Sequence, residues 1–457
     1  MQRLVAAGMS SSEARRKAEL FARANAALHE LATQGGAPGA ASSAPGAAPG
    51  GPPLSWFVPG RVEVLGKHTD YAGGRSLLMA VEQGICLVAV ARADNLVRIV
   101  AVDSAQELAF PLDDCPEPPA GHWSNYPMTV ARRIARNFPG ARHGADIAFA
   151  GDLPVAAGMS SSSALVVAIF LALSEVNGLA ERDEYRAAIH SPQELGAYLG
   201  SLENGLDFGS LEGTSGVGTF GGSEDQTAIL CCRPGMMSRY SFCPVRAEGE
   251  VPFPAGHRMV IGVSGITAEK AGAAREAYNN ASLAARAVLE RWREATGRDD
   301  ISLAAAATSA SDAPARIRAL LGANDSAGAT NAALRDRFDQ FYEESEVIIP
   351  RAADALRRGD LTTFAALVAR SHANVEVLLR NQVPETMLLV RTARALGAAA
   401  ASAFGAGFGG SVWALVPDAA ADEFSARWLE TYQRAFPSRA ASAAVLATQA
   451  GPPAVRI

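Results

Sequence analysis

The chain has 457 residues, of which 49% are hydrophobic and 19% are charged, and its formal net charge is −6. This composition is typical of a globular protein with room for two domains, and it excludes a disordered chain. The negative balance argues against nucleic acid or an anionic membrane as the main partner. The longest apolar run, "ALVVAIFLAL" at 164–173, is shorter than the roughly 20 residues that span a bilayer. The start of the chain turns polar too early for a signal-peptide core, and the five cysteines form no CxxC pair, so we expect a cytoplasmic protein.

The first part of the chain predicts a helix, a linker and then strands. Residues 10–33 have an amphipathic helical pattern, and the Gly/Ala/Pro/Ser stretch at 35–53 predicts a flexible linker. The segments at 55–66 and 84–102 are rich in β-branched and aromatic residues and predict strands. A further strand is expected at 146–150, followed by a helix over 161–178.

The second part mixes the same two kinds of element. Strands are expected at 226–231 and 258–264, and helical spacing of apolar residues predicts helices over 268–296, 331–358 and 361–380. The end alternates again, with strand patterns in 397–417 and 440–449 around a helix at 420–435. This mixture predicts an α+β protein with a helical extension (1–34), the linker (35–53) and two domains (54–250 and 251–457).

The octapeptide "VAAGMSSS" occurs twice, at 5–12 and at 155–162. A glycine and serine turn that opens a helix presents unpaired N–H groups at the positive end of the helix dipole, and such a turn can bind phosphate. The second copy stands between a predicted strand and a helix that is apolar on all sides, so it is the candidate phosphate site. The first copy predicts only a helix cap, in which Ser10 and Glu13 form a capping box.

A dense polar cluster follows the first predicted strand, in "PGRVEVLGKHTDYAGGRSL" at 59–77. It holds Arg61, Lys67, His68, Asp70 and Tyr71. The stretch is not a P-loop, because Gly60 and Gly66 are too far apart and His68 stands where the hydroxyl residue belongs. Polar groups at a strand end are well placed to bind a hydroxylated ligand, and the alternative is a solvated loop with an Asp turn.

These segments resemble the motifs of the GHMP kinases. "PGRVEVLGKHTDYAGG" resembles the galactokinase signature, "LPVAAGMSSSSAL" the second GHMP motif and "FGAGFGGSVWAL" (404–415) the third, in the family's order and over about residues 54–450. The resemblance implies a two-domain GHMP kinase fold, with an N-terminal domain like ribosomal protein S5 domain 2 and a ferredoxin-like C-terminal domain. It implies an ATP-dependent, magnesium-requiring kinase that phosphorylates the C1 hydroxyl of galactose or a related sugar in a cleft between the domains.

The resemblance also implies which residues hold the nucleotide. The expected ATP contacts are Gly158, Met159, Ser160, Ser161, Ser162, Ser163, Gly407 and Gly409. Magnesium is expected on Ser162 and Glu203, with Glu212 as a rival for the glutamate. In the third motif, Gly405 and Gly410 join the other two glycines in letting backbone approach backbone. Lys270 is expected to be structural or phosphate-directed.

Asp225, in "GGSEDQTAIL" at 221–230, matches the family's catalytic aspartate, and a strand is expected to follow it. A carboxylate within reach of a hydroxyl can accept its proton, although the sequence leaves open whether Asp225 is a base or positions the hydroxyl. Arg61 matches an arginine near the transferred phosphoryl group, where it would stabilise the transition state; the alternative is a structural ion pair. Lys67, His68, Asp70 and Tyr71 are the expected sugar contacts.

Lys67 stands where galactokinases have a glutamate, and the replacement inverts the charge and removes an acceptor. One hypothesis is therefore that the sugar carries an anionic group, as in galacturonate, glucuronate or a heptose phosphate, and that Lys67 pairs with it. The alternative is that Lys67 faces solvent or a carboxylate such as Glu63, and galactose remains the substrate. A non-catalytic sugar sensor and a mevalonate or homoserine kinase are the rival functions, and the presence of Ser162, Asp225 and Arg61 favours turnover.

Two further expectations concern the chain as a whole. The protein is expected to be a monomer or a homodimer whose ligands are the sugar and ATP. The segment 1–50 lies largely outside the motifs, so we expect its deletion to leave activity largely in place.

Overall fold

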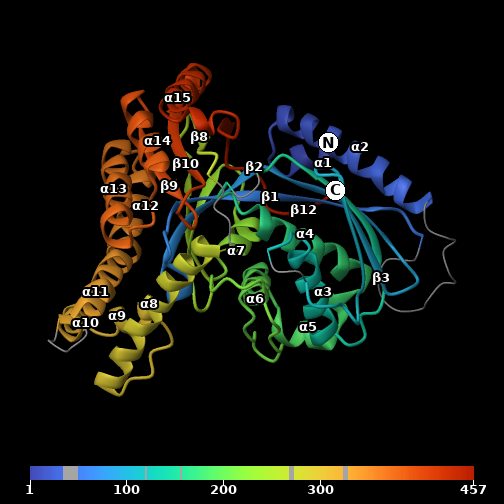
Figure 1. The fold of residues 1–457 in the computed structure, drawn as a ribbon, viewed down its shortest axis with the longest axis horizontal. Coiled ribbons are helices and arrows are strands. Elements are labelled where there is room, and N and C mark those ends of the chain that lie inside the picture. The colour runs from blue at the N-terminus through green and yellow to red at the C-terminus, as the bar shows by residue number, and fades with distance from the viewer. Residues whose placement is uncertain (34–49, 119–120, 155–156, 267–271, 323–327) are drawn as a thin grey trace.

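The computed structural model describes residues 1–33, 50–118, 121–154, 157–266, 272–322 and 328–457. Most of the expected linker at 35–53, and Lys270, lie outside these ranges. The described chain forms two sheets with helices packed around both (Figure 1). None of the helices in the described ranges combines the length and the apolar character needed to cross a bilayer.

The first sheet has the strand order β12-β1-β2-β5-β3-β4, with β6 attached to β2 and β7 to β6. Its strands are β1 (Leu54–Leu65), β2 (Arg75–Ala91), β3 (Leu96–Ala101), β4 (Gln106–Pro111), β5 (Ala145–Gly151), β6 (Met236–Ser241), β7 (Arg246–Pro252) and β12 (Val455–Arg456). Neighbouring strands are antiparallel, except that β3 and β5 are parallel. Because β12 pairs with β1, residues 455–456 form the edge strand beside the first strand of the chain.

One face of this sheet carries α4 (Ser161–Val176), with α3 (Asn125–Asn137), α5 (Asp183–Ala188) and α6 (Pro192–Asn204) beyond it (Figure 1). The α4 helix is apolar on all sides and lies between the sheet and these helices, so Val166, Phe170 and Leu173 are fully buried. This burial fixes the start of α4, which is the serine turn of the second octapeptide.

The opposite face is covered by α1 (Gln2–Ala6) and α2 (Ser11–Thr33), drawn in dark blue in Figure 1. Leu4, Met9 and Ala14 pack on Phe57 and Cys86 of the sheet. Further along α2, Ala24 and Leu28 pack on Val88 and Ala148. The N-terminal segment is therefore part of the hydrophobic core of the first sheet.

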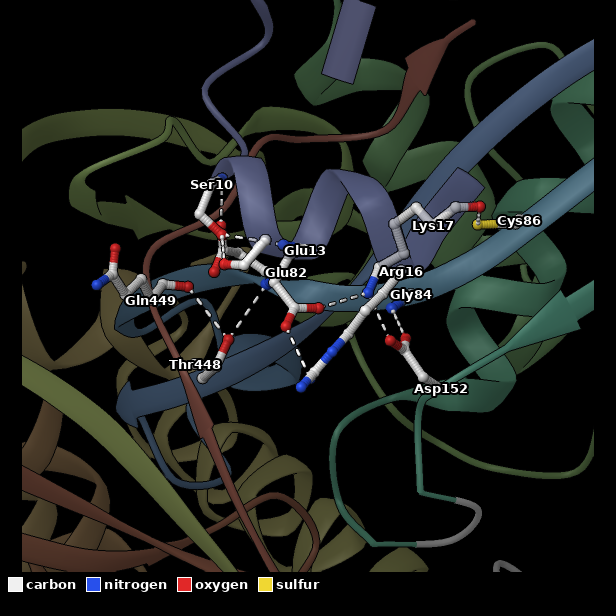
Figure 2. Close-up of polar contacts among 11 residues, drawn as sticks. Ser10, Glu13, Arg16, Lys17, Glu82, Gly84, Cys86, Asp152, Thr448 and Gln449 are labelled. Carbon is white, nitrogen blue, oxygen red and sulfur yellow. Dashed lines mark hydrogen bonds and ion pairs between the residues drawn. The ribbon is translucent and has the colours of Figure 1, made fainter. Parts of the chain in front are cut away.

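Polar contacts fasten the same helix to the sheet (Figure 2). Ser10 Oγ caps α2 by accepting from Glu13 N (3.4 Å), while Ser10 N donates to Glu82 Oε1 (2.6 Å). The capping box is therefore only half formed, and Glu13 instead accepts from the fully buried Lys17 Nζ (2.9 Å). The same ammonium donates to Asp152 Oδ2 (2.5 Å), next to the segment that leads to the serine turn.

The second sheet has the order β11-β8-β10-β9, all antiparallel, formed by β8 (His257–Val263), β9 (Ala400–Phe404), β10 (Ser411–Pro417) and β11 (Ala444–Thr448). One face packs on α14 (Pro384–Ala395) and α15 (Ala421–Ala435), and the other on α12 (Ile349–Arg357) and α13 (Leu361–Asn374). The core on the second side also includes Val62 and Leu77 of the first sheet, so the two sheets share one apolar cluster.

A helical arm extends from the second sheet (Figure 1). It comprises α8 (Gly272–Thr296), α9 (Leu303–Thr308), α10 (Ala313–Gly322) and α11 (Gly328–Tyr342), around a cluster that includes Trp292 and Phe338. Two π-helical turns, Glu343–Ile348 and Val375–Leu379, interrupt the continuous helices expected over 331–358 and 361–380.

Most of the expected elements are confirmed, including α2, β5, α4, β8 and α15. The strand expected at 226–231 is wrong, because Glu224–Cys231 form the helix α7. The segment is apolar but has only two β-branched residues, Thr227 and Ile229, and a short apolar run does not distinguish a strand from a buried helix. Asp225 therefore lies in the first turn of a helix, where the helix dipole favours a carboxylate.

Candidate active site

A polar cavity lies where the end of β1, the start of α7 and the third glycine motif meet. It is lined by Arg61, Glu63, His68, Asp70, Glu203, Thr219, Gly221, Gly222, Glu224, Asp225, Gln226, Tyr278, Gly405 and Ala406. These residues come from the first and third family-like motifs, from α6, α7 and the segment between them, and from α8 of the helical arm, and none of the lining residues belongs to the second motif. The fold thus brings together segments that are far apart in the chain.

Arg61 and Asp225, which both line the cavity, are bonded to each other. Arg61 Nε donates to Asp225 Oδ1 (2.7 Å), and Arg61 Nη2 lies 2.7 Å from the same oxygen. Arg61 Nη1 donates to the carbonyl of Gly158 in the serine turn (2.7 Å). The other carboxylate oxygen, Asp225 Oδ2, accepts from Ser163 Oγ (3.2 Å). The guanidinium and the carboxylate are therefore both bonded to the start of α4.

Arg61 is 5% exposed and remains charged in this environment. Burial alone would lower the pKa of Arg61, but the nearby carboxylates of Asp225, Glu224 and Glu63 outweigh that effect and raise it. Arg61 is therefore expected to stay charged around neutral pH.

The serine turn has the backbone that a phosphate site needs. Gly158 (φ +77°) and Ser160 (φ +59°) are both left-handed, and α4 begins at Ser161. Met159 is buried and its carbonyl accepts from Arg61 N (3.2 Å), whereas Ser161 and Ser162 are partly exposed at the helix start. The turn therefore ends in backbone N–H groups at the positive end of a buried helix.

The third motif packs against the backbone of this turn. A Cβ on Gly405 would lie 3.3 Å from the carbonyl oxygen of Gly158, and Ser411 Oγ donates to the carbonyl of Ala157 (2.5 Å). The positive-φ glycines Gly407 and Gly409 are positioned differently. A Cβ at either would overlap Asn381 or Ile266, and neither glycine lines the cavity.

Asp70 and His68 also line the cavity. Asp70 Oδ2 accepts from Glu224 N (3.3 Å), and Gly222 approaches this carboxylate so closely that a Cβ there would lie 2.4 Å from Oδ2. His68 Nε2 donates to the carbonyl of Ala406 (3.0 Å), so Nδ1 accepts from the Tyr71 hydroxyl (2.9 Å). Burial and the charge of Arg337 lower the pKa of His68 to about 4, so the ring is neutral at physiological pH.

Tyr71 and Lys67 do not line the cavity. Tyr71 orients His68 and accepts from Arg337 Nη2 (3.1 Å). Lys67 is 1% exposed, and its Nζ donates to Ser371 Oγ (3.1 Å), which in turn donates to Glu344 Oε1 (3.0 Å). This placement gives no support to the hypothesis that Lys67 pairs with an anionic sugar, because the ammonium is directed into the protein.

The two candidate magnesium glutamates are placed very differently. Glu203, at the end of α6, lines the cavity and accepts from Gln226 Nε2 (2.6 Å). Glu212 is exposed and forms an ion pair with Arg136. Only Glu203 shares the cavity with Asp225 and Arg61.

Several residues in the cavity lining or bonded to it were not expected to be part of the site. Glu224 and Gln226 flank Asp225 in the chain, and this adjacency could have indicated that they belong to the site. Glu63 follows Arg61 by two positions on β1, and the side chains of such residues share a face of a strand. Arg337, which donates to the His68 carbonyl (2.5 Å), comes from the helical arm, and no local pattern in the sequence indicated it.

Three family models match the chain. They are the galactokinase galactose-binding signature (46–92), the GHMP kinases N terminal domain (125–207) and the GHMP kinases C terminal domain (352–434). A galactokinase from Roseiflexus sp. is 29% identical over 82% of this chain and 87% of its own length. One from Actinobacillus pleuropneumoniae is 26% identical over 83% of this chain and 89% of its own length.

Solved structures share the fold. Lactococcus lactis galactokinase complexed with galactose has a TM-score of 0.72 at 22% identity, over 89% of this chain and 95% of that one. Methanococcus jannaschii mevalonate kinase has a TM-score of 0.54 at 14% identity, over 88% of this chain and 99% of that one. The expected two-domain α+β fold is thus confirmed.

Proposed function

We propose that this chain, which is a galactokinase-type sugar kinase of the GHMP superfamily, transfers the γ-phosphoryl group of ATP to the C1 hydroxyl of galactose or a closely related hexose. The observation that carries the proposal is the carboxylate of Asp225, which is bonded to Arg61 and to the serine turn at the start of α4. This arrangement supports the proposal, because a carboxylate that could accept a proton is bonded to the turn expected to bind phosphate.

The residues divide the chemistry between them. Asp225 accepts the proton of the attacking hydroxyl, or orients that hydroxyl, and Arg61 holds this carboxylate in place through its hydrogen bond. The Arg61 guanidinium also stabilises the negative charge that develops on the transferred phosphoryl group. The backbone N–H groups at the start of α4 bind the phosphates of ATP. Asp70 accepts hydrogen bonds from sugar hydroxyls, and neutral His68 shapes the wall around them.

Magnesium would be held by Glu203 and Ser162. Among the residues with described positions, no group of three or more His, Cys, Asp or Glu side chains could hold a metal ion by itself. Mg²⁺ bound together with a nucleotide needs only one or two carboxylates beside the phosphates, so a single carboxylate in the cavity and a hydroxyl at the helix start fit it. When bound, the ion neutralises charge on the phosphates.

The glutamate assignment predicts a difference between two variants. Glu203→Gln should raise the Mg²⁺ concentration needed for half-maximal activity by about 10-fold or more, because a carboxylate ligand is lost from the cavity. Glu212→Gln should leave it unchanged, since Glu212 lies on the surface with Arg136. Magnesium titrations of the ADP release rate measure both. The reverse pattern would make Glu212 the ligand.

A substrate panel tests the proposed function directly. ADP release should be fast with galactose, and ³¹P NMR of the product should show an anomeric phosphate. Arabinose, heptose phosphates, mevalonate and homoserine should be much poorer acceptors. If no sugar stimulates ADP release while galactose still binds, the chain is a sensor, and the proposed catalytic function is wrong.

The cytoplasmic location and the monomeric or homodimeric state stay predictions. Cell fractionation tests the location, and sedimentation equilibrium of the purified protein tests the oligomeric state. A predominantly membrane-associated or larger species would contradict them.

A further inference from the structure

The cavity contains a carboxyl group that the proposed chemistry does not use. Glu63 lies on β1 two residues beyond Arg61, so the two side chains point to the same face of the strand and both line the cavity. Glu63 is 3% exposed, and its Oε1 has no hydrogen-bond partner within the described protein. Buried polar atoms nearly always have a partner, so an unpaired acceptor in a cavity wall indicates that a ligand supplies the donor.

The cationic side chains near Glu63 do not donate a hydrogen bond to its Oε1. Lys67 is the nearest lysine in sequence, but its Nζ donates to Ser371. Arg61 donates to Asp225 and to the Gly158 carbonyl. Burial raises the pKa of Glu63 to about 7; Lys67 and Arg61 oppose this, and Glu344 and Asp70 add to it. Lys67 and Arg61 thus attract the carboxyl group of Glu63 electrostatically, but its Oε1 has no hydrogen-bond donor.

A second acceptor in the same wall has the same property. Gln226 is 2% exposed, its Nε2 donates to Glu203, and its Oε1 has no partner within the described protein. Two residues that line one cavity, Glu63 and Gln226, therefore each hold a buried oxygen without a donor. A molecule rich in O–H or N–H groups would satisfy both.

The balance of charge in the wall points the same way. The lining includes one guanidinium, that of Arg61, with the neutral His68 ring. It also includes the carboxyl groups of Glu63, Asp70, Glu203, Glu224 and Asp225. Burial and the repulsion of nearby carboxylates raise the pKa of Asp70 and of Glu224. The environment of the cavity therefore already disfavours the ionised form of a carboxyl group. A further carboxylate brought by the sugar would be repelled.

We propose that Glu63 contacts the sugar directly and makes the cavity select hexoses that present an O–H or N–H donor, while rejecting hexoses that carry a carboxylate. The inference rests on the proposed sugar kinase function and narrows its substrate class to neutral or amine-bearing hexoses. It excludes galacturonate and glucuronate as the natural substrates.

Three sugars test the unmodified protein. We expect kcat/KM for galacturonate to be at least about 100-fold below that for galactose, because a site built of acceptors leaves an added carboxylate unpaired and repelled. Galactosamine, whose protonated amine is a donor, should be used within about 10-fold of galactose. Equal turnover of galacturonate and galactose would overturn the inference, whatever the behaviour of any variant.

The variant Glu63→Gln tests the residue itself. The amide keeps the size of the side chain but removes the charge, so KM for galactose should rise about 10-fold with kcat within about 3-fold, the signature of lost binding rather than lost chemistry. The preference for galactosamine over galacturonate should shrink by at least about 10-fold. Glu107→Gln, at an exposed position on β4, is the matched control and should change neither value.

The outcomes separate this inference from the proposed function. If none of the hexoses stimulates ADP release, the proposed function is wrong. If it phosphorylates galactose but Glu63→Gln has the KM and the sugar preference of the parent, only the role of Glu63 is wrong. The KM for ATP and the thermal midpoint of the variant show whether it has folded, and Glu63→Asp, which retains the charge, should keep the discrimination against galacturonate.

Discussion

Replacing Asp225 with asparagine should lower kcat for sugar phosphorylation by about 10²- to 10⁴-fold, the range expected when a general base is lost. The amide can still accept a hydrogen bond from Ser163 Oγ, so the wall of the cavity should persist. It cannot take a proton from the hydroxyl, and it no longer balances the charge of Arg61. KM for ATP should change little, because the start of α4 is unaltered. Steady-state rates from a coupled ADP assay provide the measurement.

A matched control is available at Asp183, which also lies in the first turn of a helix, α5, but is exposed. Asp183→Asn should leave kcat and KM unchanged. An Asp225→Asn variant with the kcat of the parent would show that this carboxylate is not the proton acceptor, and the chemistry assigned to the cavity would have to be revised.

Removing residues 1–33 should destabilise the whole protein, contrary to the expectation that the N-terminal segment is dispensable. The deletion uncovers Phe57, Cys86, Val88 and Ala148 on the outer face of the first sheet. Each large apolar side chain buried by folding contributes roughly 1.5–3 kcal/mol, so the loss should reach several kcal/mol, comparable with the total stability of a typical domain. Soluble yield and the thermal midpoint should both fall sharply.

A point substitution separates the polar from the apolar part of this effect (Figure 2). Lys17→Met removes the buried ammonium and leaves Glu13 and Asp152 facing each other without their cation. We expect a loss of about 1–3 kcal/mol, below the full cost of breaking a buried pair because Asp152 is 30% exposed. Arg16→Met, at a 71% exposed side chain on the same turn, should cost less than about 0.5 kcal/mol.

Denaturant unfolding followed by fluorescence measures these free energies. A truncated protein as stable and as active as the parent would show that α2 is an accessory, and the burial of Lys17 would then have no energetic role. A loss in Arg16→Met equal to that in Lys17→Met would mean that the surface pair matters as much as the buried one.

The sequence was most informative where a motif is local. The serine turn, Arg61 and Asp70 each belong to a short segment whose backbone and neighbours the motif itself specifies, and all of them lie at or beside the cavity. The helix α7 was mistaken for a strand because its apolar run is short. Its conformation follows from packing against α6, β1 and α4.

Long-range contacts account for what could not be predicted. The direction of Lys67 depends on Ser371 and Glu344, which stand on the other domain. The burial of Lys17 depends on Asp152, which is remote in sequence, and the pattern of charges on its helix resembles a solvated face. Glu63 lines the same cavity as Ala406 and Tyr278, which are remote from it in sequence.

The pairing of β12 with β1 has a consequence for synthesis on the ribosome. Trp56 and Phe57 pair with Arg456 and Val455, and Gly451 N donates to the carbonyl of Ala80 in β2 (2.9 Å). While the nascent polypeptide is being made, β1 therefore keeps an open edge until almost all of the sequence shown has left the exit tunnel. An unpaired strand edge is a template for intermolecular pairing, so this interval is when co-translational chaperones would matter most to the yield.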